Sequence, residues 1–105
     1  MSSNIQVTND VFEIRLKRNY NRALNLQRKM TSYRYEPKDY EGFIRLRNLR
    51  TELKDLTLDQ LELLQKVKEQ QFDFKTSETI FETIFLRYKQ LDRDIARYVL
   101  DIQKG

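Results

Sequence analysis

The side chains that carry out most enzymatic chemistry are scarce in this sequence of 105 residues. It contains no His and no Cys, which removes the usual general base near neutral pH, the thiol nucleophile and the commonest ligands of structural zinc. Its serines have no His to activate them, so a Ser-His-Asp triad is excluded. Asp92 and Asp94 point to different sides of a helix and cannot share one substrate. We therefore predict a protein that is not an enzyme and that uses no metal, cofactor or small-molecule substrate.

Cationic side chains are the main alternative source of a binding function. Residues 1–55 hold twelve Lys/Arg against seven Asp/Glu, whereas residues 56–105 hold eight against nine. A stripe of positive charge can follow nucleic-acid phosphates without reading their sequence. Acidic residues interrupt the stripe, and Lys and Arg also cover helix surfaces for solubility, so nucleic-acid binding remains the alternative function. The candidate residues are Arg15, Arg18, Arg22 and Lys29, followed by Arg45, Arg47, Arg50 and Lys54.

The composition predicts that long helices position these residues. A third of the residues are charged, only two are Gly and one is Pro, and a chain this poor in turn-forming residues has few tight turns. No uninterrupted apolar run is long enough to span a bilayer. We predict an all-α fold, a long-helix antiparallel coiled-coil bundle without a membrane segment, located in the nucleus or the cytoplasm.

Helix start and stop signals divide the chain. A flexible lead is expected over 1–8, and a single helical interaction domain over 9–105. Thr8, Asn9 or Asp10 can cap a first helix over 9–34, which Pro37 ends because proline lacks the N–H that the helix ladder needs. A second helix is expected over 38–55. The region 58–103 is one long helix or two.

Local signals leave two of these boundaries open. Thr57 can cap a new helix, with Gln60 reaching back to form a capping box, and Thr76 or Ser77 can cap another. Gly42 is expected to weaken the start of the second helix. The apolar face of that helix is predicted to consist of Phe43, Leu46, Leu49, Leu53 and Leu56.

The clearest pattern in the sequence is an apolar ridge near the C-terminus. It fills every a and d position of three heptads with Phe81, Ile84, Tyr88, Leu91, Ile95, Tyr98 and Ile102. Leu16 and Tyr20 lie on the corresponding face of the first helix. Such a seam requires a facing helix and knobs-into-holes packing. We therefore predict that these nine side chains bind a partner, which is a second copy of the chain or another helical protein.

Three blocks of the sequence resemble the N-terminal helical domain of the ING (inhibitor of growth) family. They are Leu16-Lys17-Arg18-Asn19-Tyr20, Leu56-Thr57-Leu58-Asp59-Gln60 with Leu64-Gln65-Lys66-Val67, and Leu91-Asp92-Arg93-Asp94-Ile95-Ala96-Arg97-Tyr98. The family's zinc-binding finger has no counterpart here, and the spacing between the second and third blocks is shorter than in the family. The resemblance implies a helical scaffold subunit of a histone acetyltransferase or deacetylase complex, in which Leu91, Ile95 and Tyr98 face the packing partner.

Overall fold

The protein is a three-helix bundle. The computed structural model describes residues 2–69 and 73–104, without the side chains of residues 2–9 and Tyr33. The helices are α1 (Ser2–Thr31), α2 (Tyr40–Lys68) and α3 (Phe74–Lys104), and a short 3-10 helix, η1 (Tyr33–Tyr35), follows α1. The described residues contain no strand, so the all-α prediction is confirmed.

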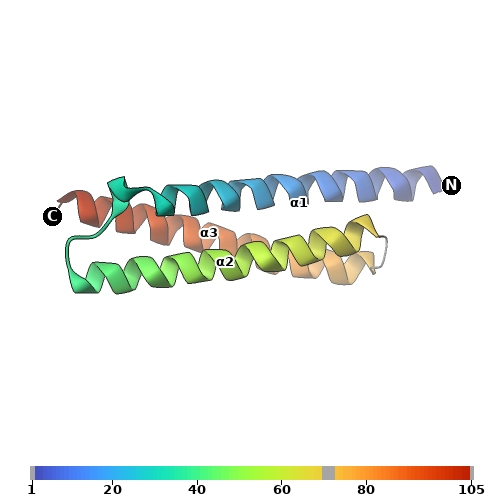
Figure 1. The fold of residues 1–105 in the computed structure, drawn as a ribbon. Coiled ribbons are helices and arrows are strands. Elements are labelled where there is room, and N and C mark those ends of the chain that lie inside the picture. Colours follow the sequence, from blue (N-terminus) through green and yellow to red (C-terminus); the bar gives the residue numbers. More distant parts are fainter. Residues whose placement is uncertain (1, 70–72, 105) are drawn as a thin grey trace.

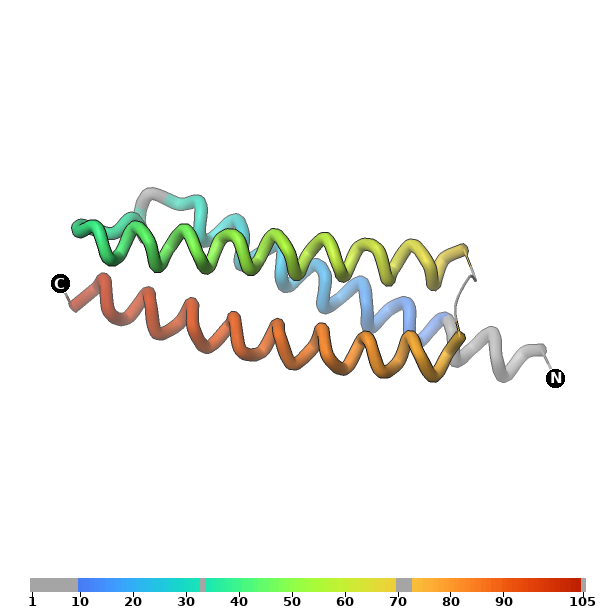
Figure 2. Tube along the Cα trace, turned by 90° about the horizontal axis from the view of Figure 1, so that it is seen from below, coloured from blue at the N-terminus to red at the C-terminus, as the bar shows by residue number. Residues whose placement is uncertain are grey.

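The three helices run antiparallel in chain order and lie side by side as a rod (Figure 1). The rod measures 59 × 18 × 16 Å. Seen from below, α2 and α3 are neighbours along their whole length, and α1 lies across the back of both (Figure 2). The C-terminal end of α3 lies beside the connection between α1 and α2.

The first helix differs from its predicted bounds at both ends. It begins at Ser2, whereas a flexible lead over 1–8 and a cap near Thr8 were expected. No Gly or Pro occurs before Pro37, so nothing in the first residues interrupts the helix. The helix ends at Thr31, before η1, and not at residue 34.

Asp39 is the cap that starts α2. Its side-chain oxygen accepts a hydrogen bond from the Gly42 backbone N–H at 2.7 Å, which satisfies a donor of the first helical turn. Gly42 also allows a close approach of the connection. A Cβ atom at this position would lie 2.5 Å from the Cβ of Pro37, so glycine is required for Pro37 to pack against the helix start.

The region 58–103 belongs to two helices, and their boundary is not at Thr57. Helix α2 runs straight through Thr57, whose hydroxyl donates to the Lys54 carbonyl oxygen at 2.9 Å, as a residue inside a helix does. The predicted caps Thr76 and Ser77 lie inside α3. Asp73 precedes α3 and accepts hydrogen bonds from the backbone N–H and the hydroxyl of Thr76, at 3.4 and 2.8 Å.

The core is a continuous seam of apolar side chains from all three helices. It is closed at the start of α3 by three rings: Phe12 packs edge-on against Phe74 and Phe81, with ring centroids 5.5 and 5.7 Å apart. One polar pair interrupts the seam. The side-chain amide of Gln60 donates to the side-chain oxygen of Asn19 at 2.7 Å, and both residues are buried. The buried apolar residues of α2 and α3 are Leu46, Leu49, Leu53, Leu56, Leu63, Leu64, Val67, Phe81, Ile84, Leu91, Ile95 and Tyr98.

Candidate interaction surfaces

The predicted C-terminal ridge lies inside the bundle. Its side chains pack in the same core as those of α1 and α2, so in the single chain the helices that cover the ridge are the chain's own. The buried members of the predicted partner-binding set are Leu16, Phe81, Ile84, Leu91, Ile95 and Tyr98, and the partly exposed ones are Tyr20, Tyr88 and Ile102. The six buried side chains are therefore not on the surface of the folded chain.

Tyr98 shows how completely the ridge is enclosed. Its exposed fraction is 0%, and its hydroxyl donates to the Tyr35 carbonyl oxygen at 2.7 Å. The Arg45 guanidinium lies over its ring, 5.5 Å from the centroid. Burial raises the pKa of Tyr98 above its ordinary value, and the charges of Arg50 and Arg45 oppose this shift. Tyr98 thus joins α3 to η1 and to the start of α2.

Three cations of the predicted basic stripe of α1 lie near aromatic side chains of α3 or η1. Arg15 lies over the Phe81 ring, 5.3 Å from its centroid, and Lys29 lies over the Tyr35 ring at 5.5 Å. Burial and Asp92 raise the pKa of Tyr88, while the charge of Arg22 lowers it, which places Arg22 within electrostatic reach of that ring. Arg15 and Lys29 therefore cover aromatic rings, and all three residues are exposed.

Helix α1 carries the whole net charge of the protein. The chain has 20 Lys/Arg and 16 Asp/Glu, and α1 contains six and two of these, which leaves 14 of each sign elsewhere. Lys17 forms an ion pair with Glu13 at 3.6 Å. Within residues 2–69 and 73–104, Arg18 has no carboxylate partner. The sequence analysis located this charge excess in the first half of the chain, and the structure concentrates it on one helix.

Two ion pairs bridge the seam between α2 and α3. Arg45 pairs with Asp101 and Asp59 pairs with Arg87, each at 2.7 Å. The two pairs are separated by fourteen residues on both helices, which is two heptads. They therefore share one antiparallel register and occupy equivalent edge positions.

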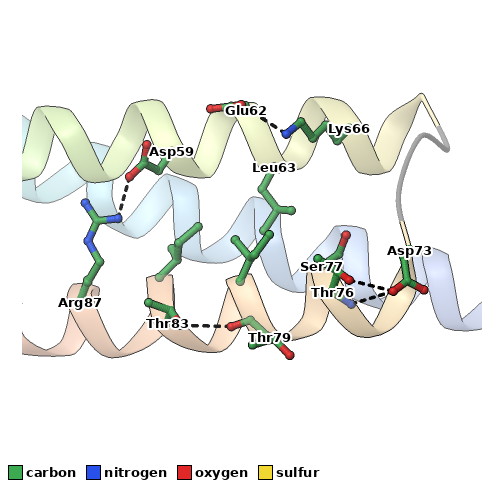
Figure 3. Close-up of a pocket in the computed structure, with 12 residues that line it drawn as sticks. Asp59, Glu62, Leu63, Lys66, Asp73, Thr76, Ser77, Thr79, Thr83 and Arg87 are labelled. Carbon is green, nitrogen blue, oxygen red and sulfur yellow. Dashed lines mark hydrogen bonds and ion pairs between the residues drawn. The ribbon is translucent and has the colours of Figure 1, made fainter.

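A groove of about 500 Å³ lies between α2 and α3 near the end where the two helices are connected (Figure 3). The Asp59–Arg87 ion pair closes one end, and Asp73 with Thr76 lies at the other. Its remaining lining consists of Glu62, Leu63, Lys66, Ser77, Thr79, Ile80, Thr83 and Ile84. Lys66 is paired with Glu62 at 3.3 Å. Among the described residues that line it, the groove thus contains no unpaired cation and no set of groups suited to acid–base chemistry.

A second groove, of about 390 Å³, lies between α1 and α2. Its described lining contains Arg28, Arg50 and Lys54 and no carboxylate. Its apolar surface comes from Leu24 of α1 and Leu53 of α2. The sequence does not predict this groove, because its cations come from two helices whose relative register is not evident from the sequence.

Large apolar side chains are also exposed at the start of α2. The exposed fractions of Tyr40, Phe43 and Ile44 are 78%, 54% and 41%. The prediction that Phe43 lies on the buried face is wrong. Leu46 and Leu49 set the buried seam, and the position one heptad before Leu49 is Gly42, so Phe43 stands at the edge of the seam.

The described residues show no other specialised site. Among them no group of three or more Asp or Glu could hold a metal ion, and none of their helices is long and apolar enough to cross a membrane. No protein-family model matches the chain, and no curated protein or solved structure is significantly similar to it.

Proposed function

We propose that this protein is a non-enzymatic helical interaction module that assembles with other proteins through its outer helix faces. The observation that carries the proposal is the exposed cluster of Tyr40, Phe43 and Ile44 on α2. Their spacing of three and four residues places them next to one another on the helix surface. Aromatic side chains are enriched in protein–protein interfaces, where they supply a large contact area at a small cost in conformational entropy.

The position of this cluster supports the proposal, because the fold does not need it. The chain closes a core along its whole length without these three side chains. Single exposed apolar residues are normal on protein surfaces, whereas adjacent ones form a patch that a partner can cover. Leu58 and Leu61, further along α2, are also exposed and three residues apart.

A role in a histone acetyltransferase or deacetylase complex is the finer form of this proposal. It rests on the resemblance of three sequence blocks to the ING family, and it implies a nuclear location. In the structure, Leu91, Ile95 and Tyr98 of the third block belong to the chain's own core. A chromatin partner would therefore contact other side chains of these blocks or the outer face of α2.

Nucleic-acid binding is the competing function, and the net charge of +4 on α1 favours it. A nucleic-acid interface would depend on Arg18, Arg22 and their neighbours on α1. It would not require the apolar cluster on α2. The two functions therefore predict sensitivity to different substitutions.

Affinity capture from a cell lysate with the full chain tests both functions. A variant with Tyr40, Phe43 and Ile44 replaced by Ser removes the cluster, and Leu86→Ser, another exposed apolar residue on α3, is the matched control. Circular dichroism establishes that both variants keep the helical fold. We expect proteins captured by the wild type to be lost with the triple variant, retained with the control and unaffected by nuclease. Capture that nuclease abolishes, or that the triple variant leaves unchanged, contradicts the proposal.

A further inference from the structure

We infer that the groove between α1 and α2 receives an acidic amphipathic helix of a partner protein. This inference rests on the proposed function and specifies the surface and the chemistry of the partner. It starts from the distribution of charge around α2. Arg50 and Lys54 line the α1 side together with Arg28, whereas Glu52 and Asp55 line the opposite side, beside Arg87 and Leu91 of α3.

The cations of the groove lack acidic partners among the residues that the structure describes. Arg28 donates to the neutral side-chain oxygen of Asn25 at 3.5 Å, and Arg50 donates to the Met30 carbonyl oxygen. Lys54 forms no ion pair with any described residue. Since Arg45 and Arg87 on the α2–α3 seam are paired with carboxylates and the cations of this groove are not, a carboxylate-bearing occupant is electrostatically complementary to the groove.

Apolar positions flank the cationic centre along the same edge of α2. Phe43 lies one heptad before Arg50, and Leu61 lies one heptad after Lys54, so both share that edge. Both side chains are exposed. The distance along the helix from Phe43 to Leu61 is about 27 Å, at about 1.5 Å per residue.

This pattern describes the occupant. A helix of about 18 residues matches the length of the edge, with apolar side chains near its two ends and carboxylates in its middle. The trough between two neighbouring helices accepts the side-chain ridges of a further helix, and Leu24 and Leu53 provide apolar surface beneath it. A nucleic acid would use the cations but not the apolar ends, so the observations favour a peptide.

A fluorescence anisotropy titration of the full chain tests the inference with designed probes. The acidic probe is a labelled helical peptide of about 20 residues with Leu near both ends and Glu at the central positions of one face. The matched probe has Lys in place of each Glu. We expect the acidic peptide to bind at least about tenfold more tightly than the basic one, and added salt to weaken its binding.

Charge reversal in the groove supplies the decisive comparison. In the variant carrying Arg28→Glu and Lys54→Glu, the acidic peptide is expected to bind at least about tenfold more weakly and the basic peptide more tightly than to the wild type. Lys66→Glu, on the α2–α3 side, is the control and should leave both affinities unchanged. Circular dichroism establishes that each variant is folded.

Four results would overturn the inference. The first two are equal affinities for the acidic and the basic peptide, and peptide affinities that the double variant leaves unchanged. The third is displacement of the acidic peptide by a DNA duplex or by phosphatidylserine vesicles at comparable concentrations. The fourth is a dimer of the chain that the double variant dissociates. Protein capture that depends on the cluster of Tyr40, Phe43 and Ile44 but not on Arg28 and Lys54 would leave the proposed function standing without this groove. Absence of captured proteins even with the wild-type chain would instead count against the proposed function.

Discussion

Arg50 of α2 donates two hydrogen bonds to the carbonyl oxygen of Met30, at 2.9 Å from Nε and 2.6 Å from Nη2. Met30 lies in the last turn of α1, where carbonyl groups have no partner within their own helix. The guanidinium therefore caps α1 from a neighbouring helix. Its positive charge also lies at the negative end of the α1 dipole.

The loss of this cap is expected to lower the stability of the bundle. Arg50→Ala should reduce the free energy of unfolding by about 1–2 kcal/mol, because a charge-assisted contact to a partly buried carbonyl is lost. Arg50→Lys should recover only part of this, since an ammonium group lacks the planar fork. Urea denaturation followed by circular dichroism measures both. Arg47→Ala, at an exposed neighbouring position, is the control, and an equal loss in that variant would refute the capping role.

The buried pair of Asn19 and Gln60 is expected to show strong coupling. In the structure Asn19 Nδ2 and Gln60 Oε1 have no hydrogen-bond partner, although the two side chains bond to each other. Gln60→Leu alone leaves Asn19 buried without its donor and should cost about 1–3 kcal/mol. The double change of Asn19→Leu and Gln60→Leu should be close to neutral or stabilising. A double-mutant cycle in urea measures the coupling, and additive effects of the two substitutions would contradict the contact.

Tyr98 is expected to make the stability of the bundle sensitive to alkaline pH. Burial raises the pKa of Tyr98 in the folded chain above its ordinary value of 10.0, so the unfolded chain releases this proton first. The stabilising contribution is complete below about pH 10 and is lost as the pH rises through the pKa of the folded chain. Tyr98→Phe should lessen this decline. It should also lower stability at neutral pH by about 1 kcal/mol, because the bond to Tyr35 is lost.

Chemical denaturation at a series of pH values from about 8 to 11 measures the effect. Tyr40→Phe, at an exposed position, should leave the pH profile unchanged. A wild-type profile that Tyr98→Phe does not alter would show that Tyr98 has the same pKa in the folded and the unfolded chain, and would contradict the prediction.

Replacing Gly42 by Ala is expected to destabilise the protein, although Ala usually stabilises a helix relative to Gly. Helix propensity alone predicts a gain of up to about 1 kcal/mol for Gly42→Ala. The new methyl group would lie 2.5 Å from the Cβ of Pro37 and 2.8 Å from Asp39 Oδ1. The rigid proline ring cannot move aside as a flexible side chain does, so we expect a net loss of about 1–3 kcal/mol. Thermal denaturation checks this, and an increase in melting temperature would contradict it.

Substitution of Glu52 by a cation is expected to increase the free energy of unfolding. It lies midway between Arg45 and Asp59 on α2, and the shared register places Asp94 of α3 opposite it. Like charges at opposite edge positions disfavour packing. Glu52→Arg should add an interhelical ion pair and raise stability by about 0.2–1 kcal/mol at low salt, with less gain at high salt. Glu82→Arg, at an exposed position of α3 that forms no ion pair with another described residue, is the control.

The helical fold and the buried ridge could be predicted from the sequence because heptad spacing follows directly from helix geometry. The identity of the covering helix could not be predicted, since a ridge such as Leu91 and Ile95 packs identically against its own chain or another. Phe43 was misplaced because Gly42, against which the Pro37 side chain packs, occupies the heptad position before Leu49. Asn19 and Gln60 occupy core positions of the helical spacing, but they were not predicted to be buried because polar side chains are usually exposed.

The charges along the seam between α2 and α3 affect the two possible directions of sliding differently. Moving α3 by one heptad in one direction would bring Glu52 beside Asp101, Asp59 beside Asp94 and Lys66 beside Arg87, so repulsion at every contact forbids that slip. The opposite displacement would exchange the native pairs for Arg45 with Asp94 and Glu52 with Arg87, which are equally attractive. A heptad corresponds to about 10 Å of travel, and the hydrogen bond from Tyr98 to Tyr35 cannot survive it. That bond at one end of the rod, together with the packing of Phe12 against Phe74 and Phe81, thus distinguishes two alignments that the surface charges alone would leave nearly equivalent.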